Sequence, residues 1–173
     1  LSYISSESLK PVKLEAEWEH TCNYIDIIKM RYMEDILFDS RVPKEMFGLK
    51  IPKLVIQPLV ENAVKYATDN IPVWKIEIRA WKDEEKWYVS VRDNGSGFPE
   101  EKLNEMREKI QNIEKTGNVP QLTMDGMGLL NIYLRMRFFY KNNLTFHMKN
   151  LPVNGAEVII GGLLQFLPEK AEI

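Results

Sequence analysis

The segment VRDNGSGFPE, residues 91–100, contains residue types that could bind a nucleotide base. Asp93 ends an alternating, strand-like run, and its carboxylate can accept a hydrogen bond from an exocyclic amine such as that of adenine. Gly95 and Gly97 carry no Cβ, so the backbone there can approach a flat ligand closely. The alternative is an ordinary surface turn, because Asn94-Gly95 is a common turn dipeptide. A calcium loop fits less well, since the further acids and the closing glutamate that it requires are missing.

The segment PLVENAVKYA, residues 58–67, places polar side chains on an otherwise apolar helical pattern. Asn62 and Lys65 are three residues apart, which makes them neighbours on the surface of a helix. An amide oxygen is a hard ligand that suits Mg²⁺, and a lysine one turn further on can meet the charge of a phosphate. The alternative is a solvated helix face with an ordinary Glu61–Lys65 pair.

Two glycines in DGMGLLNIYLRMRFFY, residues 125–140, precede an apolar helical pattern. Gly126 and Gly128 would give a flexible entry to a helix N-terminus, where backbone N–H groups can bind phosphate. The alternative is a loop followed by a core helix. Each of the three segments alone fits the simpler explanation, but together they favour a nucleotide-binding site.

A long helix is expected in the N-terminal third of the chain. Residues 1–9 look like the end of an earlier helix that Pro11 closes, and from Ile36 onward the apolar period changes toward two. We therefore place a boundary near residue 36. Spacings of three and four mark one helical face between residues 14 and 33, formed by Leu14, Trp18, Cys22, Ile25, Ile28 and Tyr32.

The remainder of the chain shows a strand, a helix, a hairpin, two helices and a second hairpin. The runs KIEIRAW and KWYVSVR alternate around the charged turn KDEE, and LTFHMK and AEVIIGG form another antiparallel pair. Pro58 either kinks the first helix or opens its main part. Strands and helices without regular alternation predict an α+β fold, a two-layer sandwich of helices on a mixed, mostly antiparallel sheet.

Composition narrows the class of protein further. The 173 residues are 45% hydrophobic and 28% charged, with a net charge of -2 and basic residues interspersed among acids, so we expect no nucleic-acid partner. The single Cys22 cannot form an internal disulfide, and no apolar run is long enough to span a bilayer. We expect a cytoplasmic domain without membrane contact. The chain begins at Leu1 within a helical pattern, so we expect it to be part of a longer protein with a membrane anchor upstream.

The segments PLVENAVKY, DNGSG and GMGLLN, in this order, closely resemble the N, G1 and G2 boxes of two-component sensor histidine kinases. LKPVKLEAEWEHTCNYIDIIKMRY, followed by IPKLVIQPLVENA, resembles the YesM/LytS-type branch. The resemblance implies the ATP-binding fold that these kinases share with type II topoisomerases. It also implies that residues 1–35 are the C-terminal part of the dimerisation and phosphoacceptor region, and that residues 36–173 are the catalytic ATP-binding domain.

The resemblance assigns roles to individual residues. Asn62 would hold Mg²⁺, Lys65 would face the phosphates, and Glu61 could assist proton transfer although helix geometry turns it about 100° away from Asn62. Hydrolysis of ATP is not expected, because Pro58 occupies the place of the acid that positions water in ATPases of this fold. The other ATP contacts would be Tyr66 at the adenine or ribose wall, Asp93 at the adenine amine, Gly95 and Gly97 at the floor, and Gly126, Gly128, Leu129, Asn131 and Arg135 on the phosphate side.

Residues 98–125 resemble the lid that closes over ATP, with a polar helical run followed by a segment containing glycine and proline. The phosphoacceptor histidine is expected in an upstream helix, because His147 alternates with core-facing residues on a strand and His20 matches a later helix. The partners implied are a response regulator and the protein's own upstream dimerisation helices, in a homodimer. Two alternatives remain: a protein-serine kinase of the anti-sigma-factor type, and a nucleotide-binding or dimerising module without turnover.

Overall fold

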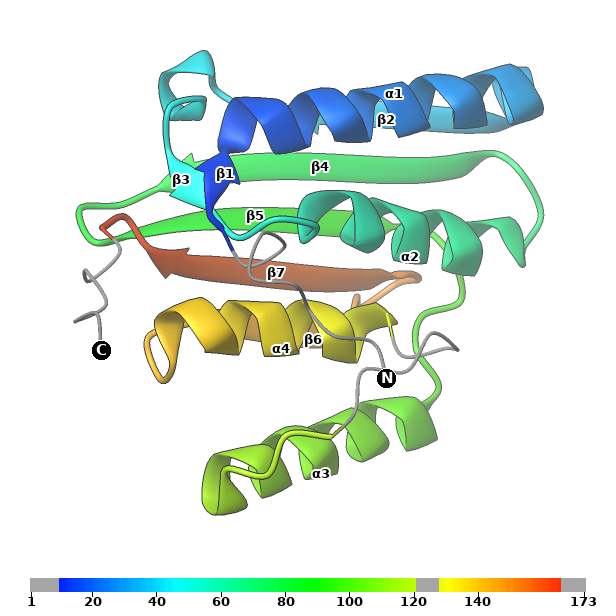
Figure 1. Cartoon of the computed structure of the whole chain (residues 1–173). Helices are drawn as coiled ribbons and strands as arrows, with labels where there is room; N and C mark the ends of the chain where they lie inside the picture. The colour runs from blue at the N-terminus through cyan, green and yellow to red at the C-terminus, as the bar shows by residue number, and fades with distance from the viewer. Residues whose placement is uncertain (1–9, 121–127, 166–173) are drawn as a thin grey trace.

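A computed structural model describes residues 10–120 and 128–165 of the chain. The predicted order of strand, helix, hairpin, two helices and hairpin is confirmed (Figure 1). The predicted helix end within residues 1–9 lies outside the described residues. The elements are β1 Val12–Lys13, α1 Leu14–Tyr32, the 3-10 turn Met33–Asp35, β2 Ile36–Arg41, the 3-10 turn Lys44–Met46, β3 Lys50–Ile51, α2 Ile56–Thr68, β4 Trp74–Lys82, β5 Lys86–Asp93, α3 Glu100–Thr116, α4 Gly128–Tyr140, β6 Thr145–Asn150 and β7 Ala156–Leu163.

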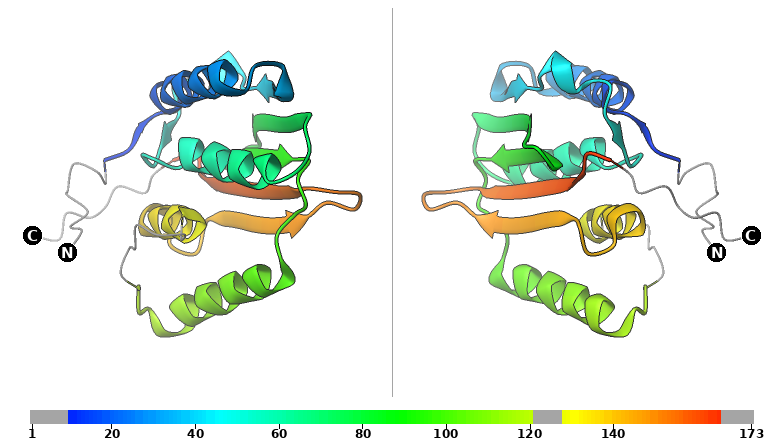
Figure 2. Two further views of the ribbon diagram at one scale, coloured as in Figure 1. Left: turned by 90° about the vertical axis from the view of Figure 1, so that its right-hand side faces the viewer. Right: turned by 90° about the vertical axis from the view of Figure 1, so that its left-hand side faces the viewer.

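Five strands form the main sheet in the order β2-β4-β5-β7-β6. The β2–β4 pair is parallel and the other three pairs are antiparallel. Helices α1, α2 and α4 lie on one face of this sheet (Figures 1 and 2). The predicted α+β fold, with helices on a mixed and mostly antiparallel sheet, is confirmed.

The hydrophobic core fills the space between the sheet and its helices. Strand β4 alternates as the period of two requires, with Trp74, Ile76 and Ile78 buried toward the helices. Helix α2 presents Leu59 and Ala63 to the same core, at the spacing of one helical turn. The apolar faces of β4 and α2 therefore pack against each other, and α2 lies over β4 and β5.

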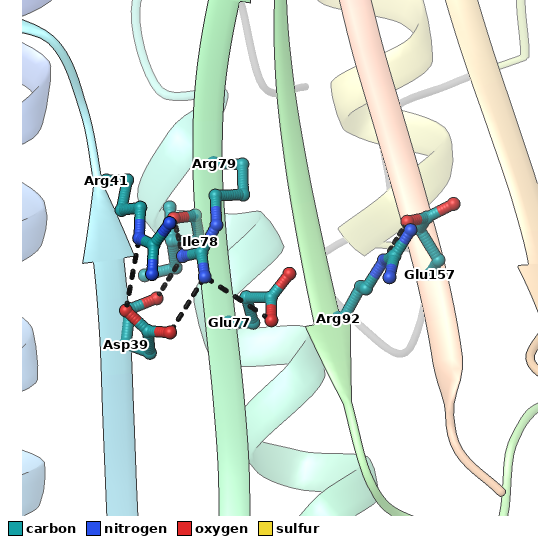
Figure 3. A network of polar contacts seen from close by, with 7 residues as sticks. All are labelled: Asp39, Arg41, Glu77, Ile78, Arg79, Arg92 and Glu157. Atoms are coloured by element: carbon teal, nitrogen blue, oxygen red, sulfur yellow. Dashed lines mark hydrogen bonds and ion pairs between the residues drawn. The ribbon is translucent and has the colours of Figure 1, made fainter.

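The opposite face of the sheet carries a network of charged side chains (Figure 3). Arg79 of β4 pairs with Asp39 of β2 at 2.7 Å and with Glu77 of its own strand at 3.4 Å. Arg92 pairs with Glu157, whose side chain is almost fully buried, across β5 and β7. These ion pairs lie on the face of the sheet opposite the helices, whereas the apolar core lies between the sheet and the helices.

Helix α1 packs into the same core as α2 and the sheet. Leu14, Ile25 and Ile28 are buried in one hydrophobic cluster with residues of α2 and β4. Strand β1 pairs antiparallel with β3, with Val12 opposite Ile51. The boundary predicted near residue 36 therefore does not separate two hydrophobic cores, and the assignment of residues 1–35 to a dimerisation region stays a prediction.

The beginning of α2 is held by a buried carboxylate from α1. Leu54 adopts a φ of 59°, which a branched side chain rarely does, and its N–H donates to the side chain of Glu17. Glu17 is only 4% exposed, and its carbonyl accepts from the Thr21 hydroxyl. Pro58 is the third residue of α2 and so lies in the first turn, where its missing N–H leaves no hydrogen bond unmade.

Helix α3 lies apart from the sheet, at the edge of the molecule beyond β6 and α4 (Figure 2). Of its 17 residues only Leu103 and Ile113 are buried. It ends at Gly117, which has a φ of 69° and donates its N–H to the Ile113 carbonyl. This helix forms most of the described part of the predicted lid, residues 98–120; residues 121–125 lie outside the described residues.

Candidate nucleotide-binding site

A pocket of about 280 Å³ lies between α2, α3 and the start of α4. It brings together six of the residues that the sequence predicted for the site, from the N and G2 boxes. Its wall consists of Pro58, Glu61, Asn62, Lys65 and Tyr66 from α2, Lys102, Glu105, Met106 and Lys109 from α3, Gly128, Leu129 and Leu130 from α4, and Phe98 and Met148.

The amphipathic character of α2 places the N-box side chains in this pocket. Leu59 and Ala63 hold one side of the helix in the core, so the polar residues between them face outward. Asn62 is half-buried, and Lys65 is exposed one turn further along. Glu61 was expected to point away from Asn62, yet it lines the same pocket. The pocket therefore extends far enough around α2 to contact both Glu61 and Asn62.

Asp93 is buried at the end of β5, with an exposure of 6%. It is not among the side chains that line the pocket. Its carboxylate accepts the N–H of Gly95 at 2.9 Å and a backbone N–H of Ala156. Burial raises the pKa of Asp93, and the two backbone hydrogen bonds oppose that rise. Within the described residues this carboxylate forms no ion pair. A buried acid without a cation is a common mark of a ligand site.

The two glycines after Asp93 allow close packing within the protein. A Cβ on Gly95 would lie 2.6 Å from the carbonyl oxygen of Tyr66, at the end of α2. Gly97 has a φ of 83°, and a Cβ there would lie 2.7 Å from Oδ1 of Asn150. These contacts bring the G1 segment against α2 and β6. The predicted approach of this backbone to a flat ligand stays a prediction.

Tyr66 joins the two sides of the pocket. Its ring meets that of Phe98 edge to face, with 5.0 Å between the ring centroids. Lys102 of α3 donates from Nζ to the Tyr66 hydroxyl at 2.5 Å and lies 5.1 Å from the ring centroid. The predicted aromatic wall is thus in the pocket, and a lysine of α3 reaches across to it.

The G2-box residues divide between two pockets. Gly128 and Leu129 line the nucleotide pocket at the start of α4, whereas Asn131 and Arg135 line a second pocket beside it. Burial lowers the pKa of Arg135, and the charge of Glu17 opposes that change. Gly126 lies outside the described residues.

The sequence patterns did not predict several of the residues that line the pocket. Lys102, Met106 and Lys109 of α3 are four and three residues apart, so they share one helix face that this spacing could have revealed. Phe98 and Met148 come from a loop and a strand, which the sequence alone could not bring together. His20, expected to be structural, is exposed on α1 and lines the second pocket. His147 is exposed on β6, opposite the core-facing residues, as predicted.

No group of three or more histidine, cysteine, aspartate or glutamate side chains that could hold a metal occurs in residues 10–120 and 128–165. A protein-only metal centre is therefore not formed by the described side chains. The predicted arrangement is of another kind, since a single amide from Asn62 would act together with phosphate oxygens. The half-buried position of Asn62 in the pocket fits that arrangement.

The family of histidine kinase-, DNA gyrase B- and HSP90-like ATPases matches residues 50–159, more than half of the chain. The chain belongs to this family. Among similar proteins are two named Sensor protein LytS. That of Oceanobacillus iheyensis is 29% identical over 149 residues, which cover 85% of this chain and 24% of the relative. That of Staphylococcus saprophyticus is 31% identical over 139 residues, which cover 79% and 22%. The chain spans about a quarter of the length of these curated relatives.

Solved structures of histidine kinases share the fold of this ATPase-family domain. The mycobacterial sensor histidine kinase MprB aligns with a TM-score of 0.60 and 15% identity, over 91% of this chain and 99% of that chain. The catalytic domain of histidine kinase ThkA aligns with a TM-score of 0.56 and 18% identity, over 91% and 97%. The family match confirms the predicted ATP-binding domain of the histidine kinase-like type, and the similarity to LytS sensors agrees with the predicted branch. In the described part of the chain, no helix has the length and apolar character needed to cross a bilayer.

Proposed function

We propose that the chain transfers the γ-phosphoryl group of Mg·ATP to the imidazole of a histidine outside this sequence. One observation carries the proposal. The buried carboxylate of Asp93, which forms no ion pair among the described residues, lies beside a pocket lined by Asn62, Lys65 and the start of α4. In this proposal the chain is the catalytic part of a sensor histidine kinase. Its full-length form would be a membrane-anchored homodimer, and the phosphoryl group would pass on to an aspartate of a response regulator.

Asp93 would select adenine. Its carboxylate already accepts two backbone N–H groups, and its remaining lone pairs can accept the exocyclic amine of the base. The wall formed by Tyr66 and Phe98 offers aromatic surface beside the base or the ribose. Guanine carries an oxygen where adenine carries this amine, so it would meet the carboxylate with an acceptor instead of a donor.

The phosphates would lie toward the start of α4. Gly128 begins this helix, whose first N–H groups have no partner within the helix and favour anions. Lys65 of α2 adds a positive charge, and Asn62 would supply an amide oxygen to Mg²⁺. When bound, Mg²⁺ would neutralise phosphate charge as the phosphoryl group leaves ADP. Catalysis by these residues consists mainly of positioning and charge neutralisation.

Titration calorimetry with ATP, with and without Mg²⁺, tests the site. Asp93→Asn should weaken ATP binding by roughly 10- to 100-fold and reduce the preference for adenine, because a charged hydrogen-bond acceptor is lost. Asn62→Ala should abolish the dependence on Mg²⁺. Asp26→Asn on the exposed surface of α1 and Asn142→Ala after α4 are matched controls that should bind ATP as the wild type does. Equal affinities for all five proteins would remove the site assignment.

Incubation with γ-labelled ATP tests the reaction. The chain alone should not label itself, because the proposed acceptor is a histidine outside this sequence. The two histidines of the chain, His147 on β6 and His20 on α1, do not have that role in the proposal. With a second polypeptide that carries the acceptor helix, label should appear there in acid-labile, alkali-stable form. Acid-stable label on the chain alone would favour a serine kinase instead. Loss of label in His20→Ala would identify His20 as the acceptor and contradict the proposal.

A further inference from the structure

A second pocket, of about 290 Å³, lies beside the nucleotide pocket where α1, α2 and α4 converge. Pro58, Glu61 and Gly128 line both pockets, so the two are adjacent across these residues. Glu61 precedes Asn62, and Gly128 begins α4. The junction is therefore at the end of the nucleotide pocket where the proposed function places the phosphates.

One wall of this second pocket is rich in hydrogen-bond acceptors. Gln57 Nε2 donates to Glu61 Oε1 at 2.8 Å, one turn along α2. Gln57 Oε1 is then buried, and among the described residues it has no hydrogen-bond partner. Turning the amide over would place its oxygen against the Glu61 carboxylate, so the hydrogen bond itself fixes the orientation. An unpaired buried carbonyl is costly, and a ligand N–H would relieve that cost.

The other walls supply donors and positive charge. His20 comes from α1, and Arg135 comes from α4 together with Asn131. Arg135 interacts electrostatically with the buried carboxylate of Glu17. The pocket thus offers donors suited to a phosphoryl group and, on α2, acceptors suited to an N–H group. A neutral imidazole beside a phosphoryl group matches this pattern, since the ring carries one N–H and one lone pair.

We propose that the second pocket receives the imidazole ring of the phosphoacceptor histidine, with Gln57 Oε1 accepting its N–H. This inference rests on the proposed function. The hydrogen bond fixes the ring tautomer and turns the unprotonated nitrogen toward the γ-phosphoryl group. Its lone pair forms the N–P bond while the bond from the γ-phosphorus to the bridging oxygen breaks, and that electron pair leaves with ADP. The ring becomes a phosphorylated imidazolium, and its N–H proton then passes to Glu61 or to water.

Nuclear magnetic resonance of the Gln57 side-chain amide tests the inference directly. The probe is 4-methylimidazole, titrated into the untagged chain with Mg·ADP bound. We expect a saturable shift of the Gln57 amide signals and of signals from His20 and Arg135. Gln57→Met keeps the volume but has no acceptor, so it should bind the probe about tenfold more weakly.

ATP affinity separates this inference from the proposed function. Calorimetry should give Gln57→Met the same ATP affinity as the wild type, and with the acceptor-helix polypeptide its KM for that polypeptide should rise. Loss of ATP binding by the wild type would overturn both proposals. Normal ATP binding with equal probe affinity in wild type and Gln57→Met would overturn this inference alone. So would probe shifts confined to residues of the nucleotide pocket, such as Tyr66 and Phe98.

Discussion

Two helices face each other across the nucleotide pocket, and they are held in place very differently. Helix α2 buries six of its 13 side chains against the sheet, α1 and α4. Helix α3 buries only two of its 17, and polar and charged residues make up most of the remainder. One wall of the pocket is thus part of the core, whereas the other is attached at few points. We predict that α2 stays fixed beneath the nucleotide while α3 closes over it.

The largest expected contrast is in hydrogen exchange. Amides of α2 should exchange only when the whole domain unfolds, at a free energy of about 5–15 kcal/mol, because their helix is part of the core. Amides of α3 should exchange through local opening at several kcal/mol less. Adding Mg·ATP should slow exchange in α3 and leave α2 nearly unchanged. Equal protection of both helices without ATP would contradict the comparison.

Truncating one buried leucine on each helix gives the next contrast. Leu59→Ala should lower the free energy of unfolding by about 2–5 kcal/mol, since its side chain is 1% exposed at the centre of the core. Leu103→Ala in α3 should cost about 1–2 kcal/mol, because the helix around it can shift and close the space. Leu37→Ala, at an exposed site on β2, serves as the control and should change stability by less than about 0.5 kcal/mol. Urea unfolding measures all three.

The next prediction concerns Glu17, which holds the beginning of α2, the more firmly packed of the two helices. Burial raises its pKa, so its contribution to stability is present at low pH and is lost as pH rises through the pKa of the folded state. Glu17→Gln keeps an acceptor for the Leu54 N–H but does not titrate. As pH rises above about 4, the variant should become progressively more stable than the wild type, until the Glu17 carboxyl of the folded wild type is ionised.

Unfolding curves at several pH values measure this gain, with exposed Glu19→Gln on the same helix as the control. A stability difference that does not change with pH would contradict the assignment. If hydrogen exchange in the Glu17 variant became faster in α3 but not in α2, Glu17 would act on α3, and its assignment to the support of α2 would be wrong.

The smallest expected effect concerns the link between the two walls. Lys102→Met removes the hydrogen bond to Tyr66 and the contact with its ring. Because this lysine is exposed, we expect ATP affinity to fall only about two- to fivefold, together with somewhat faster exchange in α3. Lys115→Met, in the last turn of the same helix and outside the pocket lining, is the control. Identical ATP affinities for the two variants would show that Lys102 does not join the walls.

The local elements of this protein could be predicted from the sequence because each has a clear period. The six apolar positions of α2 repeat at helical spacing, and the strand KWYVSVRD ends at Asp93, where β5 ends. Ordered motifs likewise predicted the ATP-binding fold and most of the pocket's α2 wall. The boundary at residue 36 could not be judged in this way, because an amphipathic helix reads alike whether it packs on its own domain or on a partner.

The sequence by itself determined which helices and strands form, since their periods and breakers act over a few residues. It also determined that Asn62, Lys65 and Tyr66 share one edge of a helix. Only the tertiary structure decided that Lys102 reaches Tyr66, 36 residues away, and that His20, Gln57 and Arg135 meet in one pocket. Those contacts depend on how three helices and a sheet pack together, and side-chain volume summed over the whole core sets that packing.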